Sequence, residues 1–135
     1  MPKILLIEDE EIFVDMFSES LRKAGFEVLS AKNGAWGIKE ALSGEFDLFI
    51  IDMMMPAMSG DEVVVKLKED EKTKDTPVII ISASVDIETQ KKVEKMGVES
   101  FFVKTQITPT DLSKRVAELL SVKMQLDRFD DLTKK

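Results

Sequence analysis

The sequence predicts an α/β fold in which five β-strands alternate with five α-helices, a (βα)5 pattern. Short apolar or β-branched runs alternate with segments of helical periodicity along most of the chain. Three of the runs, at Lys3–Ile7, Phe46–Ile51 and Pro77–Ile81, are apolar on both faces, as the inner strands of a helix-covered parallel sheet must be. The length of 135 residues corresponds to about one domain.

Spacing and terminal signals predict the elements in the first half of the chain. Over Glu11–Ala24 apolar residues recur at helical spacing, and Gly25 supplies a C-terminal stop. After a short strand at Glu27–Ala31, the Asn33-Gly34 turn leads into a helix over Ala35–Leu42. The recurring apolar residues of the first helix are Phe13, Phe17, Leu21 and Ala24.

Two helices are predicted on either side of the strand at Pro77–Ile81. Ser59 and Glu62 fit a capping box ahead of a helix that continues through Leu67. A charged and weakly amphipathic helix follows over Asp86–Met96, where Gly97 ends it.

The last strand and helix complete the predicted domain. The strand covers Phe101–Val103, and Thr108 is expected to cap a helix whose first position is Pro109. We expect a single domain over residues 1–121 and a C-terminal helix extension or frayed tail over residues 122–135, with fraying at residues 133–135. The apolar residues of the last helix are Leu112, Val116, Leu119 and Leu120.

Composition excludes several classes of function. Acidic residues outnumber basic ones by 26 to 19, giving a net charge of −7, so we expect no direct contact with nucleic acid. The chain has no cysteine and no histidine, which excludes disulfides, thiolate zinc sites and Ser-His-Asp hydrolases. No apolar run reaches the roughly 18 residues that a membrane span needs, and no secretory signal is evident. We therefore expect a cytoplasmic protein.

Polar residues follow four of the predicted strands and should meet at one edge of the sheet, where ligands of such sheets bind. They are the Glu8-Asp9-Glu10 cluster after the first strand, Asp52 after the third, Ser82 after the fourth and Lys104 after the fifth. Converging carboxylates repel one another and favour a bound cation, and Mg²⁺ prefers oxygen ligands. This pattern indicates a Mg²⁺-assisted phosphoryl site with a carboxylate nucleophile.

These residues and their spacing resemble the receiver domain of two-component response regulators over about residues 2–121. The acidic pair is Glu8-Asp9, and the signature after the third strand is Asp52-Met53-Met54-Met55-Pro56 followed by Gly60. The hydroxyl-alanine step is Ser82-Ala83, and the lysine of the fifth strand is Lys104, three residues after the aromatic Phe101.

The resemblance implies a role for each matching residue. Asp52 would accept the phosphoryl group, and Glu8, Asp9, Asp52 and the backbone carbonyl of Met54 would hold Mg²⁺. Lys104 and Ser82 would contact the phosphoryl oxygens, and Ser82 with Phe101 would form a conformational switch.

The resemblance also implies a fold and a set of partners. The fold would be a doubly wound, flavodoxin-like sheet with strand order 2-1-3-4-5. A histidine kinase or phosphotransfer protein would donate the phosphoryl group in a self-catalysed reaction, so the chain would not be an enzyme in the ordinary sense. Because little sequence follows residue 121, we expect either a stand-alone receiver or a fragment of a longer regulator. A stand-alone receiver would signal through a protein bound on Asp86–Lys95, Phe101–Lys104 and Leu112–Leu120.

Several residues differ from the common family pattern, and the sequence leaves three alternative functions. Glu8 replaces the more frequent Asp, Ser82 the alternative Thr, Thr105 the usual Pro, and Phe101 lacks the hydroxyl of Tyr. One alternative is a pseudo-receiver scaffold that is never phosphorylated. An aspartyl phosphohydrolase is disfavoured because Met54 stands where those enzymes place a second carboxylate. A flavodoxin-type cofactor binder is disfavoured because the acidic cluster would repel a phosphate.

Overall fold

Five parallel strands form one sheet in the order β2-β1-β3-β4-β5, which confirms the predicted fold class and strand order. The computed structural model describes the backbone of residues 1–133 and the side chains of residues 1–123. The strands are β1 (Lys3–Ile7), β2 (Glu27–Ala31), β3 (Leu48–Asp52), β4 (Val78–Ser82) and β5 (Ser100–Val103). The helices are α1 (Glu11–Lys23), α2 (Gly34–Ser43), α3 (Gly60–Glu69), α4 (Ile87–Lys95) and α5 (Pro109–Thr133).

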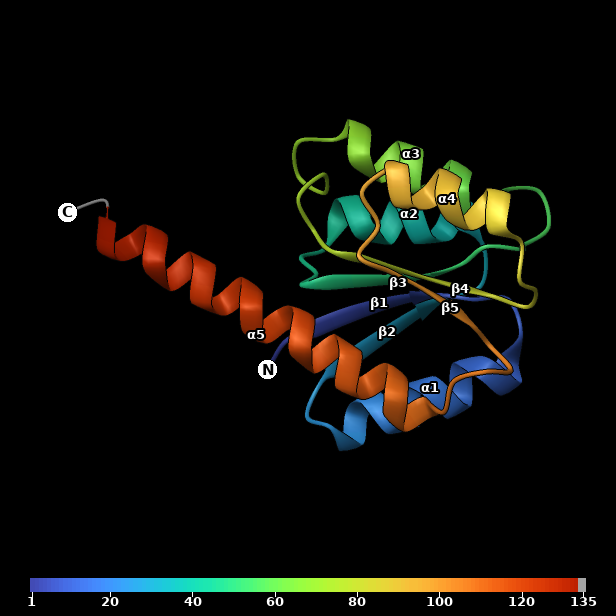
Figure 1. Cartoon of the computed structure of the whole chain (residues 1–135), viewed down its shortest axis with the longest axis horizontal. Coiled ribbons are helices and arrows are strands. Elements are labelled where there is room, and N and C mark those ends of the chain that lie inside the picture. Colours follow the sequence, from blue (N-terminus) through green and yellow to red (C-terminus); the bar gives the residue numbers. More distant parts are fainter. Residues whose placement is uncertain (134–135) are drawn as a thin grey trace.

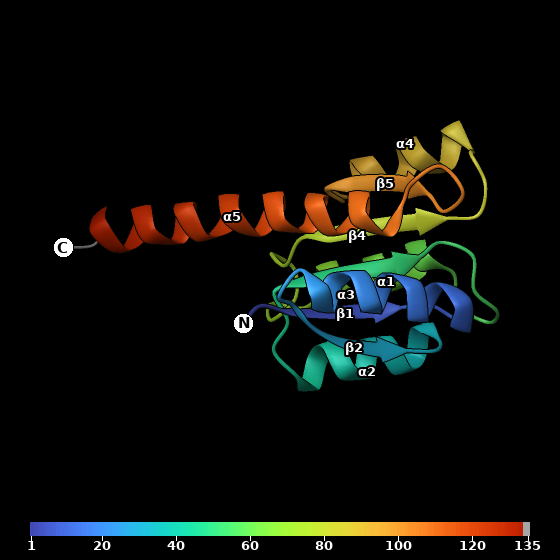
Figure 2. The same cartoon turned by 90° about the horizontal axis from the view of Figure 1, so that it is seen from below.

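Helices cover both faces of the sheet, as Figures 1 and 2 show. Helices α2, α3 and α4 lie on one face, and α1 and α5 lie on the other. Each face has its own apolar core, because alternate residues of a strand point to opposite sides. Of the inner strand β1, for example, Leu5 and Ile7 belong to the first core, whereas Ile4 and Leu6 belong to the second.

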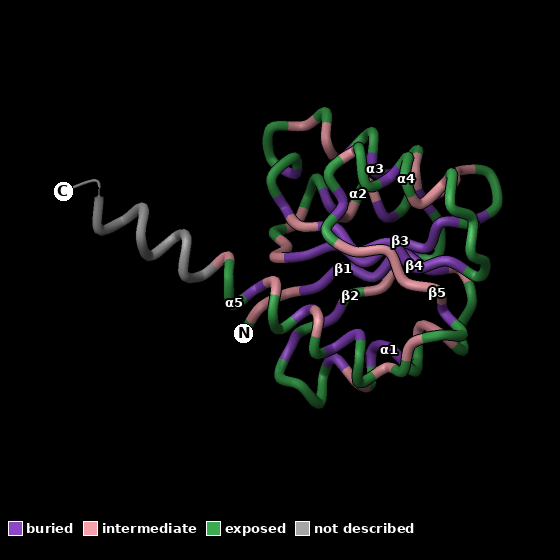
Figure 3. The backbone as a smooth tube through the Cα atoms, viewed as in Figure 1, coloured by how far each residue is buried: buried purple, intermediate pink, exposed green. Residues whose placement is uncertain are grey.

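The three strands predicted to be apolar on both faces are the three inner strands of the sheet. Their residues are buried except Lys3 at the beginning of β1, and Figure 3 shows this buried centre. The edge strands differ, because β2 exposes Glu27 and Leu29 and every residue of β5 is only half-buried. The sequence pattern therefore separated inner strands from edge strands, as full burial on both faces requires.

The third strand begins later than the sequence predicts, at Leu48 and not at Phe46. The carboxylate of Asp47 accepts a hydrogen bond of 2.7 Å from the backbone N–H of Lys3, so this residue ties the strand start by its side chain. The ring of Phe46 lies outside the strand, with the Lys3 ammonium 4.9 Å from its centre.

The capping box predicted at the beginning of α3 is wrong. The Ser59 hydroxyl makes no hydrogen bond to a backbone N–H and donates instead to the carboxylates of Asp61 and Glu62. Carboxylates are stronger acceptors than a hydroxyl, so they hold the serine as a donor. The reciprocal cap lies at α5, where Thr108 Oγ1 accepts from the Asp111 N–H at 3.0 Å and Asp111 accepts from the Thr108 N–H at 3.1 Å.

Helix α5 runs continuously from the domain into the C-terminal segment. Among its residues with described side chains, which end at residue 123, the last buried apolar one is Leu120, and the helix then projects away from the sheet to Thr133. Of the residues predicted to fray, 133–135, the structure places Thr133 in α5, and residues 134–135 lie outside the described residues. Within the described residues, no helix is long and apolar enough to cross a membrane.

Candidate functional site

The carboxyl ends of β1, β3, β4 and β5 bring the predicted site residues to one edge of the sheet. Asp52 is the last residue of β3, Ser82 is the last residue of β4, and Lys104 follows β5 directly. The backbone N–H of Lys104 donates to the Ser82 carbonyl at 2.8 Å, which extends the pairing of β4 and β5 to the edge. Glu8 follows β1 and is held by its N–H, which donates to Ala31 of β2 at 3.0 Å.

Lys104 is the centre of a buried cluster of opposite charges. Its Nζ lies 2.8 Å from Glu8 Oε1, 3.2 Å from Asp52 Oδ2 and 3.4 Å from Glu10 Oε1. The side chains of Lys104, Glu8 and Asp52 are each at most 1% exposed. An ammonium with this little water around it needs such partners, because burying an unpaired charge is very costly.

The loop after Asp52 is held close to the end of β3. Gly60, the first residue of α3, donates its N–H to the Met53 carbonyl at 2.9 Å. A Cβ atom at position 60 would lie 2.5 Å from the Asp52 carbonyl oxygen and 2.7 Å from the Met53 Cα, so only glycine fits there. Ala57, in the middle of the loop, has a φ of 67°, a left-handed conformation that is costly for alanine.

The Asp52 carboxylate is in an unusual electrostatic environment. Burial raises the pKa of Asp52 to about 7, and the charge of the neighbouring Glu8 adds to the increase. The Lys104 charge and the Met54 N–H, which donates to Asp52 Oδ1 at 3.2 Å, act in the opposite direction on this pKa. A buried carboxyl with a pKa near neutrality is typical of a functional site.

The pKa values of Glu8 and Lys104, the two charged neighbours of Asp52, are raised as well. Burial raises the pKa of Glu8, against the hydrogen bonds from Lys104 and from the Glu10 N–H. For Lys104 burial acts to lower the pKa, but the hydrogen bond to Glu8 and the charges of Asp52 and Glu8 outweigh it, so that the pKa is raised. Lys104 is therefore protonated at neutral pH.

Three buried carboxylate oxygens at this edge have no hydrogen-bond partner among the described residues: Glu8 Oε2, Asp9 Oδ1 and Asp52 Oδ2. Asp52 Oδ2 lies 3.2 Å from Lys104 Nζ and forms an ion pair with it, but no well-aligned hydrogen bond. Oxygens of Glu8, Asp9 and Glu10 also lie within 4.8 Å of one another. Unpaired oxygens of this kind suit a hard divalent cation, so the residues present fit Mg²⁺.

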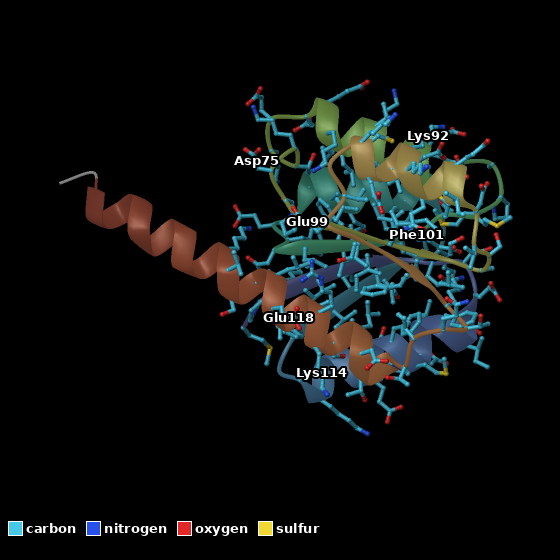
Figure 4. All side chains as sticks on the ribbon, in the orientation of Figure 1. Asp75, Lys92, Glu99, Phe101, Lys114 and Glu118 are labelled. Carbon is cyan, nitrogen blue, oxygen red and sulfur yellow. The ribbon has the colours of Figure 1, made fainter. Side chains whose placement is uncertain are left out.

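Ser82 and Phe101, the two residues of the predicted switch, form no side-chain hydrogen bond or ion pair with Asp52 in the part of the chain with described side chains. Ser82 is buried, and its Oγ accepts from the Ser84 N–H at 3.4 Å. Phe101 lies on β5, half-buried against the core beneath α2, α3 and α4 (Figure 4). A hollow of about 570 Å³ beside the site is lined by residues at and after the ends of β3 and β4, among them Met54, Ser82 and Ser84.

Two residues in contact with Lys104 were not predicted as site residues. Glu10 was recognised only as part of the acidic cluster, and Phe13 only as an apolar residue of the first helix. The Lys104 ammonium lies over the face of the Phe13 ring, with Nζ 4.5 Å from the ring centre. Helical spacing assigns Phe13 to the inner face of α1, but nothing in the spacing pairs it with a residue 91 positions later.

The Lys104–Thr105 peptide is trans, since no cis peptide occurs in the described chain.

Comparison with known protein families agrees with this geometry. The model of the response regulator receiver domain matches residues 4–117. The DNA-binding dual master transcriptional regulator RpaA of Synechocystis is 30% identical over 134 residues, which are 99% of this chain and 54% of RpaA. The transcriptional regulatory protein CusR of Escherichia coli is 33% identical over 118 residues, 87% of this chain and 51% of CusR. The chain thus spans about half the length of these curated relatives.

Solved structures show the same relationship. The chemotaxis protein CheY4 of Vibrio cholerae superposes with a TM-score of 0.81 and 29% identity, covering 87% of this chain and 98% of CheY4. The response regulator TrrA of Thermotoga maritima, solved in complex with Mg²⁺-BeF, has a TM-score of 0.77 and 29% identity, covering 88% of this chain and 99% of TrrA. With the family match extending over most of its length and the acidic edge in place, this chain belongs to the receiver domains of two-component response regulators.

Proposed function

We propose that the chain accepts a phosphoryl group on Asp52 and thereby changes its affinity for a protein partner. The observation that carries this proposal is the Asp52 carboxylate itself. It is buried, it has one oxygen without a hydrogen bond, and that oxygen lies 3.2 Å from a buried ammonium. A nucleophile beside a fixed positive charge is the arrangement that phosphoryl transfer requires.

The transfer follows from this arrangement. Oδ2 of Asp52 forms a P–O bond while the P–N bond of a donor phosphohistidine breaks, and the leaving imidazole retains the electron pair and takes up a proton. Lys104 neutralises charge on the phosphoryl oxygens during the exchange. Because this chain has no histidine, the phosphohistidine belongs to a partner, a histidine kinase or phosphotransfer protein.

Mg²⁺ is the proposed cofactor, held by carboxylates of Glu8, Asp9 and Asp52 together with the Met54 carbonyl. When bound, the ion would supply positive charge that favours the ionised form of Asp52 and stabilises the phosphoryl oxygens. The support is the set of unpaired, buried oxygens on Glu8, Asp9 and Asp52. The Mg²⁺-BeF complex of TrrA supports the same assignment by similarity.

The signal is proposed to pass from Asp52 through Ser82 to Phe101. A phosphoryl group adds acceptor oxygens near the Ser82 hydroxyl, whose present contact with Ser84 is long at 3.4 Å. If the hydroxyl moves toward those oxygens, it leaves room beside the half-buried Phe101, whose ring then turns inward. The phosphoryl group needs only to bind Ser82 better in the active state.

The partner is proposed to bind on α4, β5 and α5, the elements next to this route. Helix α4 has Val93 as its buried residue, and its other residues are charged or polar except the exposed Ile87, which suits an element that is repositioned. Lys92, Phe101, Lys114 and Glu118 on these elements are labelled in Figure 4. We also propose that residues 1–121 form the folding unit, since Leu112, Val116 and Leu120 of α5 are buried in the core of this part of the chain.

The direct test is phosphorylation by a small phosphodonor such as acetyl phosphate with Mg²⁺, followed by mass spectrometry. We expect one phosphoryl group on Asp52, none on Asp52→Asn, and none when Mg²⁺ is removed by EDTA. Lys104→Ala is expected to be phosphorylated more slowly and to bind its partner without the normal gain in affinity. An unmodified parent protein would favour a pseudo-receiver scaffold, and steady turnover of a phosphate ester would favour a phosphohydrolase.

A further inference from the structure

We infer that Phe13 is a positioning residue that holds the Lys104 ammonium beside Asp52 through the face of its ring; the kinetic part of this inference rests on the proposed function. Lys104 Nζ lies 4.5 Å from the ring centre, and the lysine side chain is 1% exposed. A desolvated cation over an aromatic ring is stabilised more strongly than an exposed one.

The ring leaves the hydrogen-bonding capacity of Lys104 free. An ammonium has three N–H donors, and in this structure Glu8 accepts at 2.8 Å and Glu10 accepts at 3.4 Å. Asp52 Oδ2 lies 3.2 Å away as an ion-pair partner without a well-aligned hydrogen bond. Phe13 stabilises the charge without accepting a directed bond, so a donor remains available for an incoming phosphoryl oxygen.

The ring is itself held by the core. Phe13 stacks on Phe17, with ring centres 5.7 Å apart, and Phe17 is 1% exposed. Helix α1 also contacts α5 through the hydroxyls of Ser20 and Ser113, 2.8 Å apart. The position of the Phe13 ring under Lys104 is therefore determined by packing of the α1 and α5 layer. Without the ring, the acidic side chains of Glu8 and Glu10 would draw the ammonium away from Asp52.

The first test measures the contact without any phosphorylation. In Mg²⁺-free protein with ¹³C-labelled lysine, we expect the ε-CH₂ protons of Lys104 to be shifted upfield by the ring. Phe13→Tyr should retain this shift and Phe13→Leu should abolish it. An unshifted Lys104 resonance in the parent protein would overturn the inference, whatever the outcome of phosphorylation.

The second test measures the rate of phosphorylation by acetyl phosphate with Mg²⁺. We expect Phe13→Leu to lower the rate between about 3-fold and 30-fold, the range for loss of a partly to fully desolvated cation–π contact. Phe13→Tyr should stay within about twofold of the parent, since it keeps the ring face. Phe46→Leu is the matched control, because Phe46 has Lys3 over its ring at 4.9 Å but lies away from the site.

A double-mutant cycle with Lys104→Met separates positioning from folding. In the Lys104→Met background, Phe13→Leu should cause no further loss of rate; an equal loss in both backgrounds would overturn the inference. If Phe13→Leu does not fold, 3,4,5-trifluorophenylalanine at position 13 keeps the shape and weakens the ring electrostatics. A reduced rate is then expected, and an unchanged rate would contradict the role. If the parent protein is never phosphorylated, the proposed function is refuted. The resonance test would still decide whether Phe13 holds the Lys104 ammonium.

Discussion

The Lys92 ammonium lies 2.6 Å from Asp61 Oδ2 and so joins α4 to the first turn of α3. Asp61 also accepts a hydrogen bond from Ser59, which ends the loop that begins at Asp52. Although burial acts to raise the pKa of Asp61, its hydrogen bonds from Lys92 and Ser59 lower it, so the carboxylate is ionised at neutral pH. The loop that follows Asp52 is thereby connected to α4, the helix proposed to respond to phosphorylation.

We predict that Lys92→Ala loosens α4 without greatly changing the stability of the domain. Lys92 is largely exposed, and exposed ion pairs contribute little to the free energy of unfolding. Locally the effect should be larger, because Val93 is the buried residue of α4. Hydrogen exchange followed by mass spectrometry should show faster exchange over Ile87–Lys95 and an unchanged melting temperature.

Lys91→Ala provides the matched control on the same helix, since Lys91 forms no ion pair with any residue whose side chain is described. It should leave exchange in α4 as in the parent. Equal acceleration in both variants would mean that lysine side chains stabilise the helix in general, and that the Asp61 contact has no special role.

We predict that Asp52→Asn stabilises the protein in EDTA at pH 8. The folded pKa of Asp52 is raised from 3.8 to about 7, so the folded state binds the proton more tightly than the unfolded state does. The free energy of unfolding of the parent should therefore decrease as the pH rises from about 4 to 7. Removing the buried charge should restore up to roughly 4 kcal/mol at pH 8, the equivalent of a rise of about three pKa units.

Urea unfolding at pH 5 and pH 8 measures this difference. Asp75→Asn, at an exposed position, should change neither value. If Asp52→Asn destabilises the protein at pH 8, then the attraction of Lys104 for the carboxylate outweighs its burial, and the sign given above is wrong.

We predict that Gly60→Ala strongly destabilises the loop between β3 and α3. The added Cβ would meet the backbone of Asp52 and Met53, which cannot move without disturbing β3. A loss of about 3 kcal/mol in thermal or urea unfolding is expected from such overpacking. Gly34→Ala is the matched control at the first position of α2, where the contacts are side-chain atoms of Met58 and Val63. Gly34→Ala should lower the free energy of unfolding clearly less than Gly60→Ala does. An equal loss in the two variants would show that contact with the backbone is not the cause.

We predict weak binding of Mg²⁺ by the unphosphorylated protein, measurable by calorimetry. Asp9→Asn and Asp52→Asn should each reduce the affinity at least tenfold, because each removes a carboxylate with an unpaired oxygen. Glu10→Gln should have a smaller effect, since Glu10 is exposed and already contacts Lys104. Undiminished binding by Asp52→Asn would place the ion elsewhere.

The sequence alone determined the order of the elements and the edge of the sheet where the site lies. Apolar runs on both faces identified β1, β3 and β4 as inner strands, because burial on two faces leaves a local pattern. Glu8, Asp52 and Lys104 could be expected to meet because each follows a parallel strand, and parallel strands end at a common edge.

Only the tertiary structure decided how these residues meet. The Ser59 hydroxyl turned to carboxylates instead of the backbone, and Asp61 found Lys92 on another helix. The ring of Phe13 came to lie under Lys104, a residue distant in the sequence. Periodicity assigns a side chain to a face of its own element, whereas distances between elements depend on how the layers pack. The raised pKa of Asp52 has the same origin, since burial and the nearness of Glu8 exist only once the sheet has formed.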